Sequence, residues 1–472
     1  MPNHGVYVSE LGTAVSTPVT VETGIPFVIG LAPVHTADNP ATAGQPVLCT
    51  TYNEFVDKLG YSDDWDTYNL CEFAYSHFKL YGMSPVIFCN LLDTSSMKSA
   101  VAAADKNVTA KKVALSNKAI PSTVIVKASS SASAALTLDT DYSLYFSDGV
   151  LTIEVLSGGS VYSATTLNVA YSEVTPASVS ASVVAAGIEN IELCMSKIGM
   201  VPDLIVAPGF SQNPTVAAVM TAKAAAINGM FPAVALVDID TAASGGADSY
   251  DEVLALKNSN NMTGALEIPC WPLGKLGDYV FHMSTILAGR IAQTDADFGA
   301  PYASPSNQAI QIDSLVDAAG NEITLTLAQA NILSNGGVVT ALNFMGGFRL
   351  WGNYTGCYPT DTDVKNYFIP IRRMFNWVTC TLIRTFWDRV DQPMNRRLID
   401  SIVDTANIWM NGLTGSGYIL GGRVEYLEED NPQTALLAGQ IKLHVYITPP
   451  SPMQELDFVL EYDASYVETA LG

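Results

Sequence analysis

Ile25-Pro26-Phe27-Val28-Ile29-Gly30-Leu31 is a nearly continuous apolar run close to the start of the chain. Such a run is typical of a central strand that is buried on both faces, and residues 85–92 form a second one. The residues between the two runs predict a helix that ends at Gly82. Its apolar face comprises Leu70, Phe73, Ala74, His77, Phe78 and Tyr81. The order strand, helix, strand predicts an α/β layer with a mostly parallel sheet.

The same alternation returns from about residue 181 onward. Helices are expected near 181–197, 214–228 and 249–258, and strands at 203–207, 233–238 and 265–269. Together with the first segment, these elements predict a discontinuous α/β core domain made of residues 23–106 and 176–337.

Residues 107–175 interrupt this core with a composition rich in Ser, Thr, Ala and β-forming residues. Alternating pairs and triplets predict short strands. They are Val124/Val126, Leu136/Leu138, Tyr142/Leu144/Phe146, Leu151/Ile153/Val155 and Leu167/Val169/Tyr171. Turns are expected at Ser147-Asp148-Gly149 and at Gly158-Gly159. We therefore expect an all-β sandwich insertion that projects outward, because it leaves and re-enters the core between a strand and a helix.

A third region, residues 338–448, predicts an α+β C-terminal domain. Strands at 338–344 and 348–351 are expected to meet at Gly346-Gly347, and two further strands at 418–425 and 440–448. Helices are expected at 372–391 and 394–411, separated at Pro393.

The end of the chain predicts a further strand at residues 455–463. Leu456, Phe458, Leu460 and Tyr462 form an apolar face, and the alternate positions are mainly acidic. The strand follows Pro449-Pro450-Ser451-Pro452, a stiff spacer that cannot continue a sheet. The strand either adds to its own sheet or completes the sheet edge of another molecule, and the spacer favours the second interpretation.

The beginning of the chain carries a matching short strand around Val6, Tyr7 and Val8. A loose segment from Gly12 to Pro18 separates it from the next strand. We therefore expect two arms, residues 1–22 and 449–472, that exchange strands between subunits. The expected hinge positions are Gly12, Pro18, Pro449, Pro450 and Pro452.

Composition narrows the function classes. The 472 residues contain 23 Lys and Arg against 46 Asp and Glu, a formal charge of −23, which repels nucleic acid and anionic membranes. The seven cysteines form no CxxC pair, as expected of buried thiols in a reducing compartment. The sequence shows no signal peptide and no apolar run of the roughly 18–20 residues that a membrane span needs. We expect assembly in a cytoplasm, with no nucleic-acid partner and no membrane insertion.

Seven of the nine arginines lie within residues 349–397. They are Arg349, Arg372, Arg373, Arg384, Arg389, Arg396 and Arg397. One interpretation is a helix buried in its own domain with solvated i,i+4 pairs, Arg384 with Asp388 and Arg396 with Asp400. The other is a contact face that complements an acidic neighbour.

Motifs for catalysis are missing from the sequence. It contains no G-x-x-x-x-G-K-[ST], no G-x-G-x-x-G, no G-x-S-x-G, no H-E-x-x-H and no Cys/His cluster. We therefore expect no enzyme activity, no cofactor and no metal ion. An enzyme hypothesis would need a site at the carboxyl ends of strands such as 203–207, followed by Pro208-Gly209-Phe210.

An ordered series of segments resembles the contractile tail sheath proteins of phages and related particles. These segments are Val338-Val339-Thr340-Ala341-Leu342-Asn343, Gly346-Gly347-Phe348-Arg349-Leu350-Trp351-Gly352-Asn353, Phe368-Ile369, Arg372-Arg373, Thr385-Phe386-Trp387-Asp388, Gly421-Gly422-Arg423, Asn431-Pro432 and Glu461-Tyr462-Asp463. Pro2-x-x-Gly5-Val6-Tyr7-Val8 and Phe27-Val28-Ile29-Gly30 with Ala32-Pro33 resemble the family near the start of the chain.

This resemblance implies a structural polymer in the contractile tail of a virion or phage-tail-like particle. Subunits would form stacked six-fold rings around an inner tail tube protein, with baseplate and tail-terminator or collar proteins at the ends. The sheath would be built in a metastable extended state and would contract to drive the tube through a cell envelope. The arginines would face the tube, and the insertion would face outward. The alternative is an acidic oligomeric surface-binding protein that uses the β insertion to bind a carbohydrate or receptor.

Overall fold

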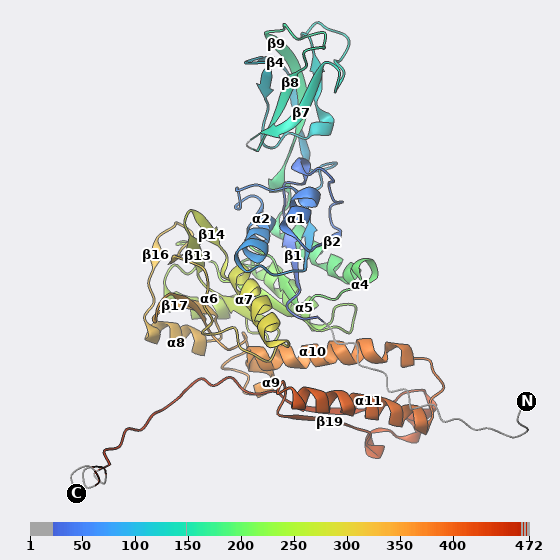
Figure 1. The fold of residues 1–472 in the computed structure, drawn as a ribbon, viewed down its shortest axis with the longest axis vertical. Helices are drawn as coiled ribbons and strands as arrows, with labels where there is room; N and C mark the ends of the chain where they lie inside the picture. The colour runs from blue at the N-terminus through green and yellow to red at the C-terminus, as the bar shows by residue number, and fades with distance from the viewer. Residues whose placement is uncertain (1–21, 148, 464–465, 467–468, 470–472) are drawn as a thin grey trace, which may run out of the picture.

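The computed structural model describes residues 22–147, 149–463, 466 and 469. Its centre is a six-stranded sheet in the order β12-β11-β10-β1-β3-β2 (Figure 1). The strands are β1 (Pro26–Gly30), β2 (Pro46–Cys49), β3 (Val86–Asn90), β10 (Leu204–Val206), β11 (Val234–Asp238) and β12 (Glu267–Cys270). Five of them run parallel, and β2 pairs antiparallel with β3 at one edge. The expected α/β layer with a partly parallel sheet is thus present.

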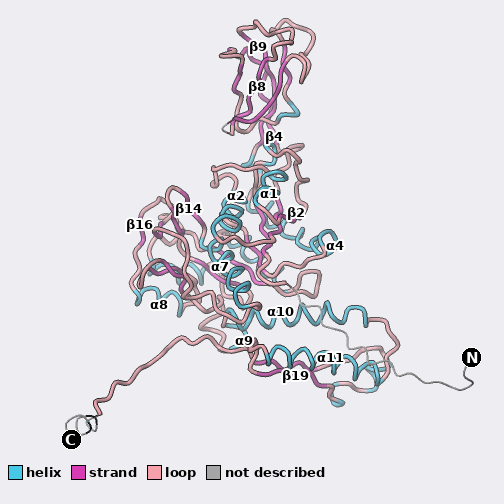
Figure 2. The backbone as a smooth tube through the Cα atoms, viewed as in Figure 1, coloured by secondary structure: helices cyan, strands magenta, loops and turns pink. Residues whose placement is uncertain are grey.

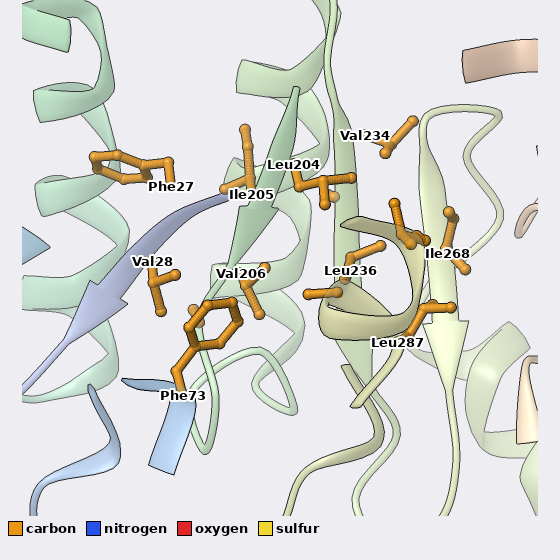
Figure 3. Close-up of a cluster of buried hydrophobic side chains, with 14 of the residues drawn as sticks. Phe27, Val28, Phe73, Leu204, Ile205, Val206, Val234, Leu236, Ile268 and Leu287 are labelled. Atoms are coloured by element: carbon orange, nitrogen blue, oxygen red, sulfur yellow. The ribbon is translucent and has the colours of Figure 1, made fainter. Parts of the chain in front are cut away.

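Helices cover both faces of this sheet, as a parallel sheet requires. The first set of helices consists of α2 (Asn69–Ala74) and α7 (Met283–Phe298), which together contact β1, β10 and β11. The second set consists of α3 (Ala181–Gly187) and α5 (Pro214–Ala225), which together contact the same three strands. Buried side chains line both faces of the sheet (Figure 3): Phe27 and Ile205 lie on one face, and Leu204 and Leu236 lie on the other, because successive residues of a strand alternate. Further helices of the core include α1 (Tyr52–Leu59), the π-helical segment Tyr75–Leu80, the 3-10 helices Val34–Thr36 and Ile188–Glu192, α4 (Leu193–Ile198) and α6 (Tyr250–Ser259).

The insertion between β3 and α3 is built mainly of β-strands, with a short 3-10 helix at Pro121–Thr123, and stands away from the core at one end of the molecule (Figures 1 and 2). Its strands are β4 (Lys98–Asn107), β5 (Lys112–Ala114), β6 (Ile125–Lys127), β7 (Tyr142–Ser147), β8 (Val150–Val155) and β9 (Thr166–Val174). They form two three-stranded sheets, β4-β9-β6 and β5-β8-β7, over a separate hydrophobic cluster. Strand pairing begins at Lys98, nine residues before the expected 107, because Lys98 already pairs with Val174. Leu136 and Leu138 form no strand, and Leu138 makes only an isolated bridge to Tyr142.

A small antiparallel sheet that the sequence did not predict lies beside β12, in the order β14-β13-β15-β16. Its strands are β13 (Leu273–Leu276), β14 (Tyr279–Phe281), β15 (Ser314–Val316) and β16 (Glu322–Ile323), followed by α8 (Leu327–Asn335). The hairpin β17 (Thr340–Asn343) and β18 (Phe348–Trp351) turns at Gly346 and Gly347, both with positive φ. Val339 also bridges to Cys270 of β12. The hairpin therefore packs with the core, although the sequence placed it in the C-terminal region.

The C-terminal layer lies on the side of the core opposite the insertion (Figure 1). Its elements are α9 (Val364–Tyr367), α10 (Ile369–Phe386), α11 (Arg396–Gly415), β19 (Gly421–Glu425), α12 (Gln433–Leu437) and β20 (His444–Thr448). Helix α10 faces the core, since Asn376 Nδ2 donates to the Ala233 carbonyl at 3.0 Å. Helix α10 begins at Ile369, three residues before the expected start, because Pro370 is tolerated in a first turn. It ends at Phe386, where the chain tightens into the 3-10 turn Trp387–Arg389.

Candidate strand-exchange site

The C-terminal arm leaves the body of the molecule after β20 (Figure 1). In the part of the chain that the structure describes, residues 455–462 belong to no sheet. The side chains of the expected apolar face are uncovered, with Leu456 62%, Phe458 79%, Leu460 95% and Tyr462 85% exposed. The single chain thus holds four large apolar groups in water at alternate positions, without a strand of its own to cover them.

The root of this arm is attached to the body. Gln454 Oε1 accepts a hydrogen bond from Tyr354 Oη at 2.5 Å, and Pro449 is buried. The expected hinge at Pro449, Pro450 and Pro452 therefore lies before the last contact with the body. A hollow of about 780 Å³ separates the root from residues 302–308 and α8. The four apolar side chains of the expected strand all lie beyond this last contact.

The N-terminal positions Val6, Tyr7, Val8, Gly12 and Pro18 lie outside the described residues. The described chain starts at Glu22 and is held firmly from Thr23 onward. Thr23 Oγ1 donates to Asp295 Oδ2 at 2.7 Å, and the amide of Ile25 donates to Asp203 Oδ1 at 2.7 Å.

Strands β19 and β20 form the candidate acceptor of an arm. They pair antiparallel from Gly421 with Thr448 to Glu425 with His444, and no further strand of the described chain joins either edge. Two-stranded ribbons are marginal alone, and free edges attract further strands. Helix α11 packs on β19, while Val445 and Tyr446 of β20 are 38% exposed. The ribbon is thus anchored on the molecule and open at its edges.

The seven arginines do not form one surface. Arg373 is 3% exposed and pairs with Asp295 Oδ2 at 2.5 Å and with Asp203 Oδ2 at 2.8 Å. These buried pairs hold α10 against the core, so the interpretation of Arg373 as an interface residue is wrong. Burial would lower the pKa of Arg373, but the two carboxylates raise it above its ordinary value.

The other six arginines divide into two groups. Arg349 donates to the Asn307 carbonyl at 2.7 Å, Arg372 to Asn376 at 3.2 Å, and the partly buried Arg384 lines a hollow beside Trp387. The expected pair of Arg384 with Asp388 gives way to one between Arg389 and Asp388 at 3.6 Å. The expected pair of Arg396 with Asp400 is present at 2.9 Å and is solvent-exposed. Arg389 lies in the 3-10 turn that follows α10, and Arg396 and Arg397 lie in the first turn of α11.

The carboxyl ends of β10 and β11, where an enzyme hypothesis would place its site, carry a buried polar cluster. Asp238 accepts hydrogen bonds from Ser211 Oγ at 3.0 Å and from Ser284 Oγ at 2.5 Å. Burial raises the pKa of Asp238, and these hydrogen bonds and His282 oppose the shift. The cluster ties the first turn of α7 to β11. No sequence motif indicates this cluster, because Ser211, Asp238 and Ser284 are far apart along the chain.

His282 forms a second ion pair next to this cluster. Its Nδ1 lies 2.8 Å from Glu72 Oε2, and its amide donates to Glu72 Oε1 at 2.7 Å. Burial lowers the pKa of His282, but Glu72 and Asp238 outweigh burial and raise it to about 9. The imidazolium therefore joins α2 to the loop that precedes α7.

The described residues offer neither a metal site nor a helix that could span a membrane. Within residues 22–147 and 149–463, no three His, Cys, Asp or Glu side chains are grouped so as to hold a metal ion. None of the helices in the same residues is long and apolar enough to cross a membrane.

Comparison with known proteins relates the whole chain to one class. The tail sheath protein of Burkholderia phage BcepMu is 25% identical over 495 aligned residues, which cover 99% of this chain and 98% of that protein. The chain is a relative of the contractile tail sheath proteins. A scan against models of protein families finds no match.

Solved structures of sheath assemblies share the fold. The contracted sheath complex of the extracellular contractile injection system PVC has a TM-score of 0.61 at 13% identity, over 99% of both chains. A chain of the six-fold symmetrised baseplate of the anti-feeding prophage has a TM-score of 0.57 at 14% identity, over 98% of this chain and 99% of that one. These structural matches cover almost the full length of this chain. Nothing in these likenesses supports the alternative of a carbohydrate- or receptor-binding surface protein.

Proposed function

We propose that this chain is the structural subunit of a contractile tail sheath. Copies would stack as six-fold rings around an inner tail tube, in an extended state that lies above the contracted state in free energy. The observation that carries the proposal is the uncovered, alternating face of residues 456–462. A relative over almost the full length of the chain is a tail sheath protein, and this supports the class of assembly.

The arm of one copy would add as a further strand to the β19–β20 ribbon of a neighbour, and residues 6–8 of another copy would add in the same way. Covering the four apolar side chains of the C-terminal arm would contribute at least about 6 kcal/mol before the cost of ordering the arm. Main-chain hydrogen bonds along the ribbon edge would fix the register. The arms would then keep subunits linked while their bodies rotate between two states.

The shape of the molecule supports the orientation that we propose for the subunit. The insertion and the C-terminal layer lie at opposite ends (Figure 1). We place the C-terminal layer toward the tube, with Arg389, Arg396 and Arg397 as the arginines that contact the tube protein. The insertion then faces outward. The ends of the tube would meet baseplate and terminator proteins.

The test is tube formation by truncated chains. A chain that ends at Pro450 lacks the arm and should remain folded but form no tubes in negative-stain electron microscopy. A chain that ends at Asp463 keeps the apolar face and serves as the matched control, so it should form tubes like the full chain. Tubes of uniform width from the chain ending at Pro450 would contradict the proposal.

A further inference from the structure

A groove runs between α10 and the loop that contains residues 228–232. Its first part is lined by Glu22, Pro232, Trp377 and Cys380 and is almost filled, with about 10 Å³ left. Its second part is lined mainly by apolar side chains and leaves about 590 Å³ open. The lining of this second part is Glu192, Met195, Ser196, Asn228, Met230, Phe231, Ile383, Arg384 and Trp387. The two parts share both walls, because Pro232 follows Phe231 and Ile383 lies one turn beyond Cys380.

The second part of the groove exposes apolar surface. Trp387 is 62% exposed, and Met195 and Met230 are 37% and 36% exposed. Methionine side chains adapt to the shape of a bound segment, and apolar patches of this kind mark contact sites. Phe231 is 5% exposed and forms part of the wall.

The described chain enters this groove at its filled end and in a defined direction. Thr23 Oγ1 contacts Arg373 Nη2 at 3.2 Å, and Glu22 lines the hollow beside Trp377 and Cys380. Thr23 therefore lies near Arg373, and the preceding residue Glu22 lies farther along α10, near Trp377 and Cys380. Followed toward its N-terminus, the chain thus runs toward the C-terminal end of α10. From Arg373 to Trp387, α10 extends about 21 Å, which is close to the reach of about 23 Å for seven extended residues.

The sequence that precedes Glu22 fits such a path. Residues 15–21 read Val15-Ser16-Thr17-Pro18-Val19-Thr20-Val21. In an extended chain Val15, Thr17, Val19 and Val21 share one face, and Ser16, Pro18 and Thr20 share the other. One side of this segment can therefore cover apolar surface while the other remains in water.

We propose that residues 15–21 of the same chain occupy the open part of the groove, with Val19 and Val21 against Met230, Ile383 and Trp387. This placement goes beyond strand exchange, because it concerns a free single chain and holds whether or not a sheath forms. It makes the root of the N-terminal arm a docked segment, so that the arm leaves the molecule beside the turn between α10 and α11. The neighbour that receives residues 6–8 is then the one that lies beyond this turn.

Photo-cross-linking of the full-length single chain tests this docking. Trp387 is replaced by p-benzoylphenylalanine, which keeps an aromatic ring in the groove, and the irradiated protein is digested after glutamate. Cleavage after Glu10 and Glu22 releases residues 11–22 as one peptide. We expect this peptide to be joined to position 387 in a product of single-chain mass. The same photo-reactive residue at Leu437, which is 80% exposed in α12, is the control and should give no such product.

Paired substitutions separate docking from simple proximity. Val19→Asn with Val21→Asn would bury two amides without partners, so the cross-link yield should fall about tenfold. Thr20→Asn, on the opposite face, should leave the yield within about twofold, because its side chain stays in water. A product of twice the chain mass would place another copy in the groove and overturn the proposal. Equal yields from the two variants, or cross-links only to other peptides, would do the same.

Discussion

The buried charge of Arg373 joins three segments that are distant in the sequence: α10, α7 through Asp295, and the approach to β10 through Asp203. Burying charges has a cost that close pairing offsets, so the loss of one partner leaves the others uncompensated. Arg372 and Arg373 are adjacent in the sequence, but Arg372 bonds to Asn376 of its own helix and Arg373 bonds to Asp295 of α7. The sequence pattern alone therefore does not show which of the two is buried.

Arg373→Met should therefore lower the free energy of unfolding by about 3–5 kcal/mol, since it leaves Asp295 buried without its cation. Urea unfolding of the single chain measures the change. Arg396→Met is the matched control and should leave the stability almost unchanged, because the pair with Asp400 is exposed. Equal losses in the two variants would show that Arg373 has no special structural role.

His282 predicts a loss of stability at alkaline pH. Its folded pKa of about 9 lies above the ordinary value of 6.5, because Glu72 and Asp238 outweigh burial. The folded chain therefore keeps a proton that the unfolded chain releases above pH 6.5. The contribution of the pair to stability is fully present below pH 6.5 and is lost as the pH rises through 9, by an amount on the order of 2–3 kcal/mol.

Unfolding free energies of the parent chain and of Glu72→Gln at pH 6.5 and pH 9 measure this contribution. Glu72→Gln should remove most of the decline, whereas Glu252→Gln, which changes an exposed carboxylate of α6, should keep it. A decline of the same size in Glu72→Gln and in the parent would mean that the ion pair does not cause it.

Among the elements, the C-terminal arm carries a sharp contrast between two faces. Leu456→Ser with Phe458→Ser removes apolar surface that strand addition would cover, so assembly should weaken by several orders of magnitude. Asp457→Ser with Glu461→Ser changes the other face and should leave assembly nearly intact. Sedimentation of polymers across a concentration series measures both. Equal weakening in the two variants would show that the apolar face is not what binds.

Much of the element order could be predicted from the sequence, because long periodic or apolar segments carry strong signals. The runs at β1 and β3, the helix on residues 69–80 and the turn at Gly346-Gly347 are present. The four-stranded sheet β14-β13-β15-β16 was missed, since its strands have only two to four residues and show no periodicity. The early start of β4 was missed because its Lys-, Ser- and Ala-rich strand is mostly exposed.

The candidate site was predictable only in part, for a related physical reason. Alternation along residues 455–463 is a local signal, and their exposure in the single chain agrees with an arm whose partner lies elsewhere. Arg373 is buried in ion pairs, whereas Arg389, Arg396 and Arg397 lie at the turn between α10 and α11. This difference depends on tertiary packing, which the sequence does not reveal. The acceptor ribbon β19–β20 was predicted only as two strands, because its open edges appear only in the topology.

At the scale of the whole molecule, the fold consists of three parts that lie one after another. The core holds the shape, the insertion stands at one end, and the C-terminal layer with its open ribbon stands at the other (Figure 1). If the arm of one copy pairs with the ribbon of another copy, the stability of the polymer depends on strand pairs that a single chain cannot form. Contraction would then rearrange rigid bodies around strand pairs that persist.

An electron cryomicroscopy map of tubes formed by the full chain tests this central claim most directly. The account predicts that the backbone of residues 455–463 in each copy lies within hydrogen-bonding distance of β19 or β20 in a different copy. Residues 455–463 lying against β20 of their own chain, or outside any sheet in an assembly without an axial stack, would contradict it.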